Sequence, residues 1–592
     1  MLRITRCHPM RRLAFTALGL SLLAACASNP TPPPATEPVA VTPTEAVEVA
    51  ERPFPADSIY PLLVAEFAIR RQDYQIALDN YLEQASILQD AGVSRHTTHL
   101  AQFVQSDAQS LEAVQLWLAE EPDSLEAHNT AGTLLARAQR PVEALPHMAF
   151  LARAGKQANF PLLLQGFAQL DPQSQSQLVQ GLNDLLVEFP EDPALLLTLA
   201  LVNTEFEQFE QALARLEALF QVEPYQHQAL LLEARIGIQT EAEQPFARIE
   251  QALEVNPEDS RLRLEYARLL TNTDMDAARA QFEILSVQSP DDADLLLSLA
   301  LINRETGDDV IAKAYLQKVL ETGKRRDEAH YYLGRIAEES KQPAEALEHY
   351  MQVGDSRQYL AANQHIGQIL VTGGQLEASQ AWFAQQRRAV PTRSEQLYGL
   401  EAEILRNNGA TLAALAVLSA GIEAFPDSSS LRYARSMLGQ QRNDLAMMET
   451  DLRAILARDP NNATALNALG YTLADQTDRY DEAHKLIARA LELDPEEPAI
   501  LDSMGWVLYR LGDIEGALAY LTRAYALFPD PEVAAHLGEV LWVSGDTEEA
   551  KKIWQGALLK DPQHSVLHST LERLGVEDLN SAPLPPGANP GK

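Results

Sequence analysis

The chain has 592 residues, of which 83 are Asp or Glu and 47 are Lys or Arg, so its formal net charge is −36 at pH 7. A protein this acidic repels nucleic acid and anionic lipid head groups, which excludes both as main partners and favours binding to other proteins. The hydrophobic fraction of 46% is typical of a folded chain, so the acidity does not indicate disorder.

Residues 1–25 have the organisation of an export signal. Several arginines precede an uncharged apolar segment, residues 13–25, which is shorter than the roughly 20 residues that span a bilayer. Met10 is an alternative start to Met1, because the sequence from Met10 onward is itself a complete short signal. The arginines are Arg3, Arg6, Arg11 and Arg12.

The signal ends in the sequence LAAC, residues 23–26, which resembles the lipobox of bacterial lipoproteins. This resemblance implies that the chain is cut before Cys26 and that lipid is joined to the Cys26 thiol. The next residue is Ala27 rather than Asp, which by the same resemblance favours the outer membrane, with the chain facing the periplasm. The alternative is an ordinary secretory signal or an N-terminal anchor helix. Because Cys7 would leave with the signal, the mature chain would have no free thiol for a disulfide or a metal.

Residues 26–57 are predicted to form a lipidated tether between the anchor and the folded part. The segment is rich in proline and has no apolar periodicity, so it favours extended polyproline conformations of about 3 Å per residue. At the other end, residues 563–592 form a C-terminal segment whose tail, 581–592, is also rich in proline and glycine.

Between these ends, residues 58–562 contain a regular repeat. Prolines occur at positions 190, 224, 257 and 290, and again at 391, 426, 460, 495, 529 and 562, which gives intervals of 33 to 35 residues. The gap from 290 to 391 accommodates three further intervals of about 34 residues. A fixed period of this length is typical of stacked helical repeats.

Aligned units show which residues recur. Residues 505–529 and 538–562 carry glycine, alanine, a large apolar residue and proline at matching offsets, and the unit around 334–350 shares part of the pattern. Small residues let two helices approach closely, and a proline ends the second helix, so each unit is expected to be a helix–turn–helix. The matching residues are Gly505, Gly512, Ala517, Leu521, Ala524 and Pro529; Gly538, Gly545, Ala550, Trp554, Ala557 and Pro562; and Gly334, Ala346 and Tyr350.

This pattern resembles the tetratricopeptide repeat. The resemblance implies an all-α fold, an α-solenoid of about 12 to 14 repeats that forms a right-handed superhelix with an extended concave surface. The match is strong in the last three units. It is weak at residues 89–121, 156–190 and 429–460, and in the last of these Met448 replaces the usual alanine.

Patterns of catalytic, cofactor or metal sites are not found in the sequence. It has no H-E-x-x-H, C-x-x-C, G-x-S-x-G, Walker A or G-x-G-x-x-G motif. His96 and His99 share a helix face, but two histidines without further ligands favour a surface role over a metal site. We therefore expect a protein that is not an enzyme and uses no cofactor.

Candidate binding residues follow from the family's groove, which is lined by the first helix of each unit. We take Gly470, Gly505 and Gly538 as the eighth residues of their units, so that positions five, nine and twelve of each unit face the groove. These positions include an amide and several aromatic residues, a combination that suits the binding of an extended peptide. The alternative for each aromatic is packing between repeats. Three arginines at comparable positions form either a basic track or ion pairs with neighbouring carboxylates, of which the second is favoured. The candidates are Asn467, Tyr471, Trp506, Tyr509 and Trp542, with Arg268, Arg304 and Arg335.

The combination of anchor, tether and repeats is similar to the tetratricopeptide-repeat outer-membrane lipoproteins of pseudomonads that serve as adaptors for carboxyl-terminal processing proteases. This resemblance implies a scaffold that binds the serine protease and presents substrates, such as peptidoglycan cross-link hydrolases, for degradation. One alternative is an assembly lipoprotein for a secretin, pilus or exopolysaccharide export machine. Another is a cell-wall enzyme or glycan-binding module.

Overall fold

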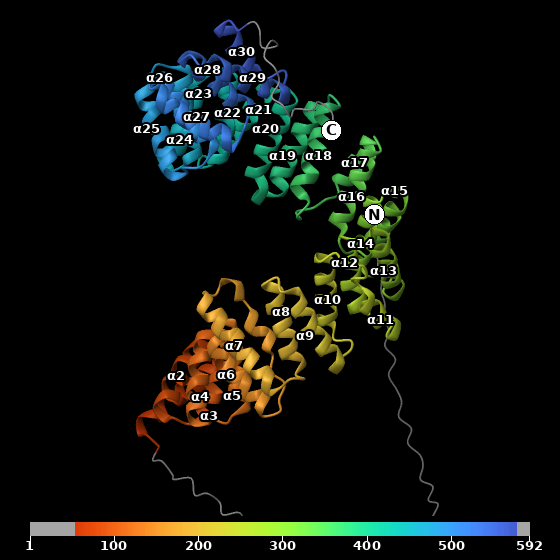
Figure 1. Cartoon of the computed structure of the whole chain (residues 1–592). Coiled ribbons are helices and arrows are strands. Elements are labelled where there is room, and N and C mark those ends of the chain that lie inside the picture. Colours follow the sequence, from red (N-terminus) through yellow and green to blue (C-terminus); the bar gives the residue numbers. More distant parts are fainter. Residues whose placement is uncertain (1–53, 577–592) are drawn as a thin grey trace, which may run out of the picture. The chain divides into compact units, whose positions relative to one another are not determined.

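The computed structural model describes residues 54–576, and these residues form α-helices joined by short turns and four 3-10 helices, with no β-strand among them (Figure 1). The all-α solenoid expected from the repeats is therefore confirmed. Cys26, the signal and most of the tether lie outside the described residues, as does the tail from residue 577. Within residues 54–576, no helix is long and apolar enough to cross a membrane.

The chain divides into two compact units, residues 1–198 and 199–592, and the boundary falls inside helix α8. The described part of the first unit begins with the 3-10 helix η1 (Ala56–Ser58) and contains three helix pairs, two 3-10 helices and one long helix. The helices are α1 (Ile59–Arg71), α2 (Tyr74–Leu88), α3 (Ala91–Phe103), α4 (Asp107–Glu120), α5 (Leu125–Arg137), α6 (Pro141–Arg153), η2 (Phe160–Leu164), η3 (Phe167–Gln169), α7 (Pro172–Glu188) and α8 (Pro193–Glu205).

From α8 to α29 the helices follow one another as eleven pairs, so with the first three pairs the array reaches the upper end of the expected repeat number. The helices up to residue 407 are α9 (Phe209–Val222), α10 (His227–Gln239), α11 (Ala247–Val255), α12 (Ser260–Leu270), α13 (Met275–Gln288), α14 (Ala293–Glu305), α15 (Asp309–Glu321), α16 (Arg326–Glu339), α17 (Pro343–Tyr350), α18 (Tyr359–Thr372), α19 (Leu376–Ala389), η4 (Pro391–Arg393) and α20 (Ser394–Asn407).

The remaining helices complete the second unit, and the last one, α30, lies beyond Pro562 in the predicted C-terminal segment. They are α21 (Thr411–Ala424), α22 (Ser429–Gln441), α23 (Leu445–Arg458), α24 (Ala463–Gln476), α25 (Tyr480–Leu493), α26 (Pro498–Leu511), α27 (Ile514–Leu527), α28 (Pro531–Ser544), α29 (Thr547–Lys560) and α30 (Ser565–Leu574).

The turns within the last repeats follow directly from their sequences. Gly512 and Gly545 end α26 and α28 with φ angles of +89° and +99°, a left-handed conformation that glycine adopts without a steric penalty. The next residue in each case is an aspartate, Asp513 or Asp546, whose carboxylate accepts a hydrogen bond from the backbone of the following helix. A Gly-Asp dipeptide therefore ends one helix and begins its partner.

Small residues set the distance between the paired helices. A methyl group on Gly505 would lie 2.5 Å from the Leu521 side chain, and one on Gly538 would overlap with the indole ring of Trp554. Both large residues are fully buried. The glycine of the first helix thus provides the space that the large residue of the second helix fills, and the pair packs at close range.

The three segments with weak repeat patterns differ in structure. Residues 89–121 and 429–460 form ordinary helix pairs, α3 with α4 and α22 with α23. In residues 156–190, the first helix of a unit is replaced by η2 and η3 before α7. Where the repeat usually has alanine, Met448 is buried, and its sulfur lies 3.3 Å from the Thr472 hydroxyl, which donates a hydrogen bond to the Ala468 carbonyl.

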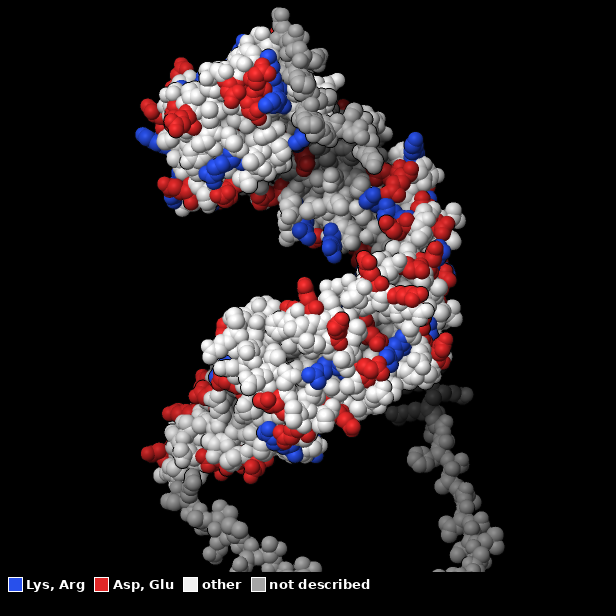
Figure 2. All heavy atoms as spheres, in the orientation of Figure 1, with Lys and Arg blue, Asp and Glu red and all other residues white. Residues whose placement is uncertain are grey.

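Acidic and basic side chains are interspersed over the face of the molecule drawn in Figure 2, and they often lie beside one another. Many arginines join successive repeats through ion pairs. Arg153 contacts Glu188 at 3.0 Å, and Arg479 contacts Glu449 at 3.0 Å. Exposed pairs of this kind each contribute only about 0–1 kcal/mol to stability.

Two repeats contain an unexpected contact between histidines. Nδ1 of His128 lies 2.9 Å from Nδ1 of His147, and Nδ1 of His330 lies 3.2 Å from Nδ1 of His349. Burial lowers the pKa of His147, and the neighbouring His128 lowers it further. Burial likewise lowers the pKa of His330 and of His349.

From the lowered pKa values of these histidines we expect mild acid to destabilise the two repeats that contain them. A histidine whose pKa is lowered in the folded state binds fewer protons there than in the unfolded chain, where its pKa is about 6.5. Its contribution to stability is therefore fully present above about pH 6.5 and is lost as the pH falls below that value. Thermal unfolding at pH 7.5 and pH 5.5 should show that acidification lowers the unfolding temperature less for His147→Gln than for the native chain. An equal loss in both would contradict this assignment.

Candidate protein-binding site

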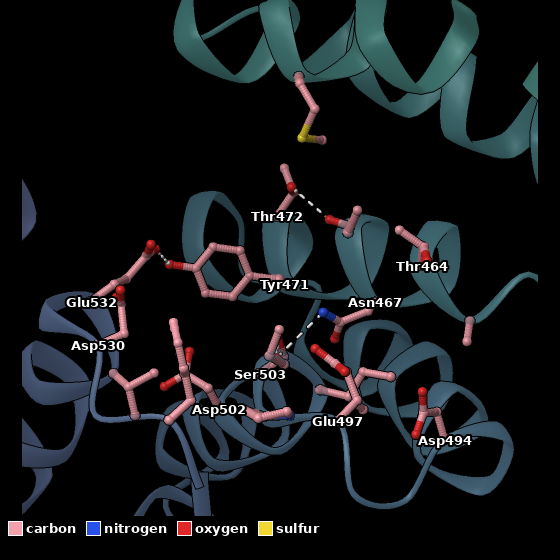
Figure 3. Close-up of a pocket in the computed structure, with 18 of the residues that line it drawn as sticks. Thr464, Asn467, Tyr471, Thr472, Asp494, Glu497, Asp502, Ser503, Asp530 and Glu532 are labelled. Atoms are coloured by element: carbon pink, nitrogen blue, oxygen red, sulfur yellow. Dashed lines mark hydrogen bonds between the residues drawn. The ribbon is translucent and has the colours of Figure 1, made fainter. Parts of the chain in front are cut away.

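A pocket of about 830 Å³ lies in the second unit, on the first helices of successive repeats (Figure 3). Helices α22, α24, α26 and α28 line it, together with Met448 of α23 and the turns that precede α26 and α28. Its lining residues are Tyr433, Met437, Gln440, Met448, Ala463, Thr464, Asn467, Ala468, Tyr471, Thr472, Asp494, Glu497, Pro498, Ala499, Ile500, Asp502, Ser503, Phe528, Asp530, Glu532 and Val533. We refer to it as the α22–α28 pocket.

Two of the predicted groove residues, Asn467 and Tyr471, line this pocket from α24. Figure 3 shows the Tyr471 ring directed across the pocket to Glu532, and its hydroxyl donates a hydrogen bond to Oε1 of Glu532 at 3.1 Å. Burial raises the pKa of Tyr471 well above its usual value, and the carboxylates of Glu532, Asp475 and Asp502 raise it further. The phenol therefore stays protonated and serves as a hydrogen-bond donor.

A buried ion pair lies behind the pocket. Nδ1 of His536 is 2.9 Å from Oδ2 of Asp502, and both residues are almost inaccessible to solvent. Burial opposes a charge on His536, but the carboxylates of Asp502, Glu532 and Asp475 together outweigh this effect, so the pKa of His536 is raised. The Trp506 ring stacks on His536 with 4.3 Å between ring centroids. This cluster links α26 to α28 and fixes one wall of the pocket.

The other predicted aromatics lie outside the pocket lining. Trp506 is only 5% exposed and packs between repeats. The Tyr509 hydroxyl donates a hydrogen bond to Glu539 at 3.2 Å, and Trp542 packs against Trp554 with 5.7 Å between ring centroids. Trp506 therefore takes the packing position that the sequence left as its alternative, whereas Tyr509 and Trp542 are half-buried.

The three predicted arginines each pair with a carboxylate. Arg268 lies 2.8 Å from Glu265, whereas Arg304 and Arg335 share Glu339 at 2.6 and 2.8 Å. Because every one of these guanidinium groups already has an acidic partner, they do not form an unpaired basic track.

The charge of the α22–α28 pocket is the feature that sequence reasoning missed. Five carboxylates line it, and no Lys or Arg does. They are Asp494, Glu497, Asp502, Asp530 and Glu532. Four of them lie in or next to the turns before α26 and α28, and two of these four, Glu497 and Asp530, are the N-cap residues of the two helices. An acidic residue recurring in the same turn of consecutive units was the available signal.

The described residues contain no cluster of three or more histidine, cysteine or acidic side chains arranged to hold a metal. His99 instead contacts Glu126 at 3.1 Å, and His96 packs against the Tyr81 ring with 4.7 Å between centroids.

The α22–α28 pocket is suited to binding, because it offers apolar walls, hydrogen-bond acceptors and negative charge.

Comparison with known proteins supports the class that the fold and pocket define. Tetratricopeptide-repeat families match residues 508–574, and residues 311–353 and 434–498. A TPR repeat-containing protein of Pseudomonas aeruginosa is 40% identical over 518 residues, which cover 86% of each chain. The chain therefore belongs to the tetratricopeptide-repeat proteins.

Other similarities are more distant or shorter. Bacteriophage adsorption protein A of Escherichia coli is 31% identical over 93 residues, which are 16% of this chain and 9% of that protein. Among solved structures, a thermophilic TPR protein of Thermus thermophilus has 22% identity and a TM-score of 0.28, covering 31% of this chain and all of that one. Yeast Tom70 has 14% identity and a TM-score of 0.27, covering 88% of this chain and 94% of its own.

Proposed function

We propose that this protein is a lipid-anchored scaffold of the periplasmic face of the outer membrane, which holds a carboxyl-terminal processing protease and presents wall hydrolases to it. The observation that carries the scaffold is the presence of two separate surfaces with different chemistry, one in each unit. A scaffold that brings two proteins together needs two such surfaces. The lipobox-like sequence at Cys26 and the proline-rich tether support the anchoring.

The first surface is the apolar face of α1. Ile59, Leu63 and Phe67 are four residues apart and therefore share one side of the helix, and each is more than half exposed. Tyr60 beside them is 76% exposed. Large apolar side chains gathered in this way are characteristic of a protein-binding surface. We assign the protease to this face, because apolar burial supports a lasting association.

The second surface is the α22–α28 pocket, to which we assign the substrates. Charged groups at a rim mainly accelerate association and select partners, which suits a protein that must arrive and leave repeatedly. With the protease on one unit and a substrate on the other, each experiences the other at a high effective concentration, which can raise apparent affinity by about 10²–10⁴ without any new contact.

The two surfaces can be tested separately by using the purified full chain as bait in periplasmic extract and identifying the retained proteins by mass spectrometry. We expect Leu63→Glu with Phe67→Glu to lose the protease and keep the hydrolases. Asp494→Lys with Glu497→Lys should do the reverse. Matched controls are Val187→Glu, which changes another exposed apolar residue of the first unit, and Glu305→Lys with Glu515→Lys, which reverse exposed charges outside the pocket.

Other results would reassign the protein. Recovery of a secretin or export channel without any protease would place it among assembly lipoproteins. Binding to purified peptidoglycan without a protein partner would indicate a glycan-binding module.

The anchor gives a further prediction. Cells grown with labelled palmitate should incorporate the label into the native chain and into Cys7→Ala, and should not incorporate it into Cys26→Ala, because Cys26 is the proposed acylated residue. Cys7 is the matched control, since it is the other cysteine of the chain. Label that persists in Cys26→Ala would contradict the lipid anchor.

A further inference from the structure

The polar side chains of the α22–α28 pocket have unequal hydrogen-bonding states. Asp502 is paired with His536, and Glu532 accepts a hydrogen bond from Tyr471. Asp530 accepts one from the backbone N–H of Glu532 at 2.8 Å, as a helix cap. Three of the five carboxylates therefore already have partners within the fold.

Asp494 and Glu497 differ from these three. Both are exposed at the mouth of the pocket, on the turn between α25 and α26, and their carboxylates make no ion pair or hydrogen bond within residues 54–576 (Figure 3). Only a ligand or solvent can provide a partner for these two carboxylates. With no Lys or Arg in the lining, their charge is not balanced locally.

In the view of Figure 3, the amide of Asn467 lies between these carboxylates and Tyr471. Its Nδ2 donates one long hydrogen bond, 3.4 Å, to the carbonyl of Ala499, and its Oδ1 is buried without any partner. A buried acceptor without a donor is costly, by about 1–3 kcal/mol. Because Oδ1 is buried, the amide must turn toward the pocket before Oδ1 can accept a hydrogen bond from a ligand N–H group.

Apolar side chains complete the pocket. Tyr433 and Met437 come from α22, and Phe528, which is 57% exposed, comes from the turn before α28. Aliphatic stems of Lys and Arg pack well on such surfaces while their charged ends remain at a polar rim. The volume of about 830 Å³ accommodates a few residues of an extended chain.

We propose that the α22–α28 pocket binds an extended, Lys- or Arg-bearing segment of the substrate protein. The cationic ends contact Asp494 and Glu497, the stems lie along Tyr433 and Phe528, and a backbone N–H of the segment donates to Asn467. This assignment rests on the proposed function, since it specifies what the substrate-binding surface recognises. The same lining disfavours an acidic segment. The carboxylates of such a segment would lie against the negative charges of the pocket and against hydrogen-bond acceptors, which cannot donate to them.

Fluorescence polarisation with the full chain tests this directly. Three labelled peptides of one length share the same apolar residues and carry Lys and Arg, Gln, or Glu at the variable positions. We expect the cationic peptide to bind at least about tenfold more tightly than the Gln peptide, and the Glu peptide not to bind. Raising the salt concentration from 50 to 500 mM should weaken cationic binding several-fold, because exposed charges are screened.

Variants distinguish binding at the pocket from a general attraction of cationic peptides to an acidic protein. Asp494→Asn with Glu497→Gln should weaken binding of the cationic peptide by about tenfold, and Asn467→Ala should weaken all peptides equally. The control Glu305→Gln with Glu515→Gln removes the same charge elsewhere and should have little effect. Equal binding of the three peptides, or an equal loss in the control, would overturn the proposal.

Failure of the proposed peptide recognition can be distinguished from failure of the proposed scaffold function. If peptide binding lacks charge preference while the bait still retains protease and hydrolases, only the recognition chemistry is wrong. If the cationic peptide binds as expected and the bait retains neither protein, the pocket assignment stands and the protease scaffold is wrong.

Discussion

Asp451→Ala is expected to lower the free energy of unfolding of the α22–α23 repeat by about 3 kcal/mol. The Asp451 carboxylate is fully buried and lies 2.7 Å from Arg435 and 3.3 Å from Arg432. Removing it leaves two mostly buried guanidinium groups without a counter-charge. The expected loss lies at the lower end of the range for buried pairs, because both arginines retain partial access to solvent.

The measurement is amide hydrogen exchange of α22 and α23, because a solenoid opens locally rather than as one unit. The matched control is Asp427→Ala, which breaks the exposed pair between Asp427 and Arg458 and should cost less than about 1 kcal/mol. If the two variants lost protection equally, the buried cluster would not stabilise this repeat.

Gly538→Ala is expected to destabilise the α28–α29 repeat by about 1–3 kcal/mol, although alanine favours a helix more than glycine does. The added methyl group would overlap with the indole ring of Trp554, which is fully buried, so the ring or the helix would have to shift. Overpacking therefore outweighs the gain in helix propensity.

Gly556→Ala on α29 is the matched control. Its added methyl group would meet only the Tyr525 hydroxyl, at 3.8 Å, an ordinary contact. This variant should stabilise the helix by about 0.5–1 kcal/mol, so the two changes have opposite signs. Denaturant unfolding that showed the same sign for both would contradict the close-packing account.

The fold was predictable because its determinants are local and periodic. Gly505, Ala517 and Leu521 have counterparts at the same offsets in the next unit, and the Gly-Asp turns combine a left-handed glycine with a helix cap. The irregular segment at 156–190 was marked only by the weakness of the pattern. The Asp451 cluster was not predictable, because its partners lie 16 and 19 residues away, and a charged residue at a buried position gives no signal until the helices are packed.

The binding site was predictable only in part. Asn467 and Tyr471 line the pocket, whereas Trp506 is buried between repeats, although the same helical positions were used to select them. Helical position identifies the side of a helix, but the packing of neighbouring helices decides whether a residue there reaches the pocket. The carboxylates Asp494 and Glu497 were not predicted as binding residues, because acidic residues are so frequent in this chain that a solvated surface explains them equally well.

The most direct test of the scaffold is its concentration dependence in a reconstituted reaction. Purified carboxyl-terminal processing protease and a peptidoglycan cross-link hydrolase are mixed at fixed concentrations, and the rate of hydrolase degradation is followed while the full chain is titrated. A scaffold that holds both proteins predicts a rise of at least about tenfold and then a fall at excess scaffold, because separate copies then hold each partner apart. A rate that does not change, or one that rises to a plateau without falling, would contradict the scaffold.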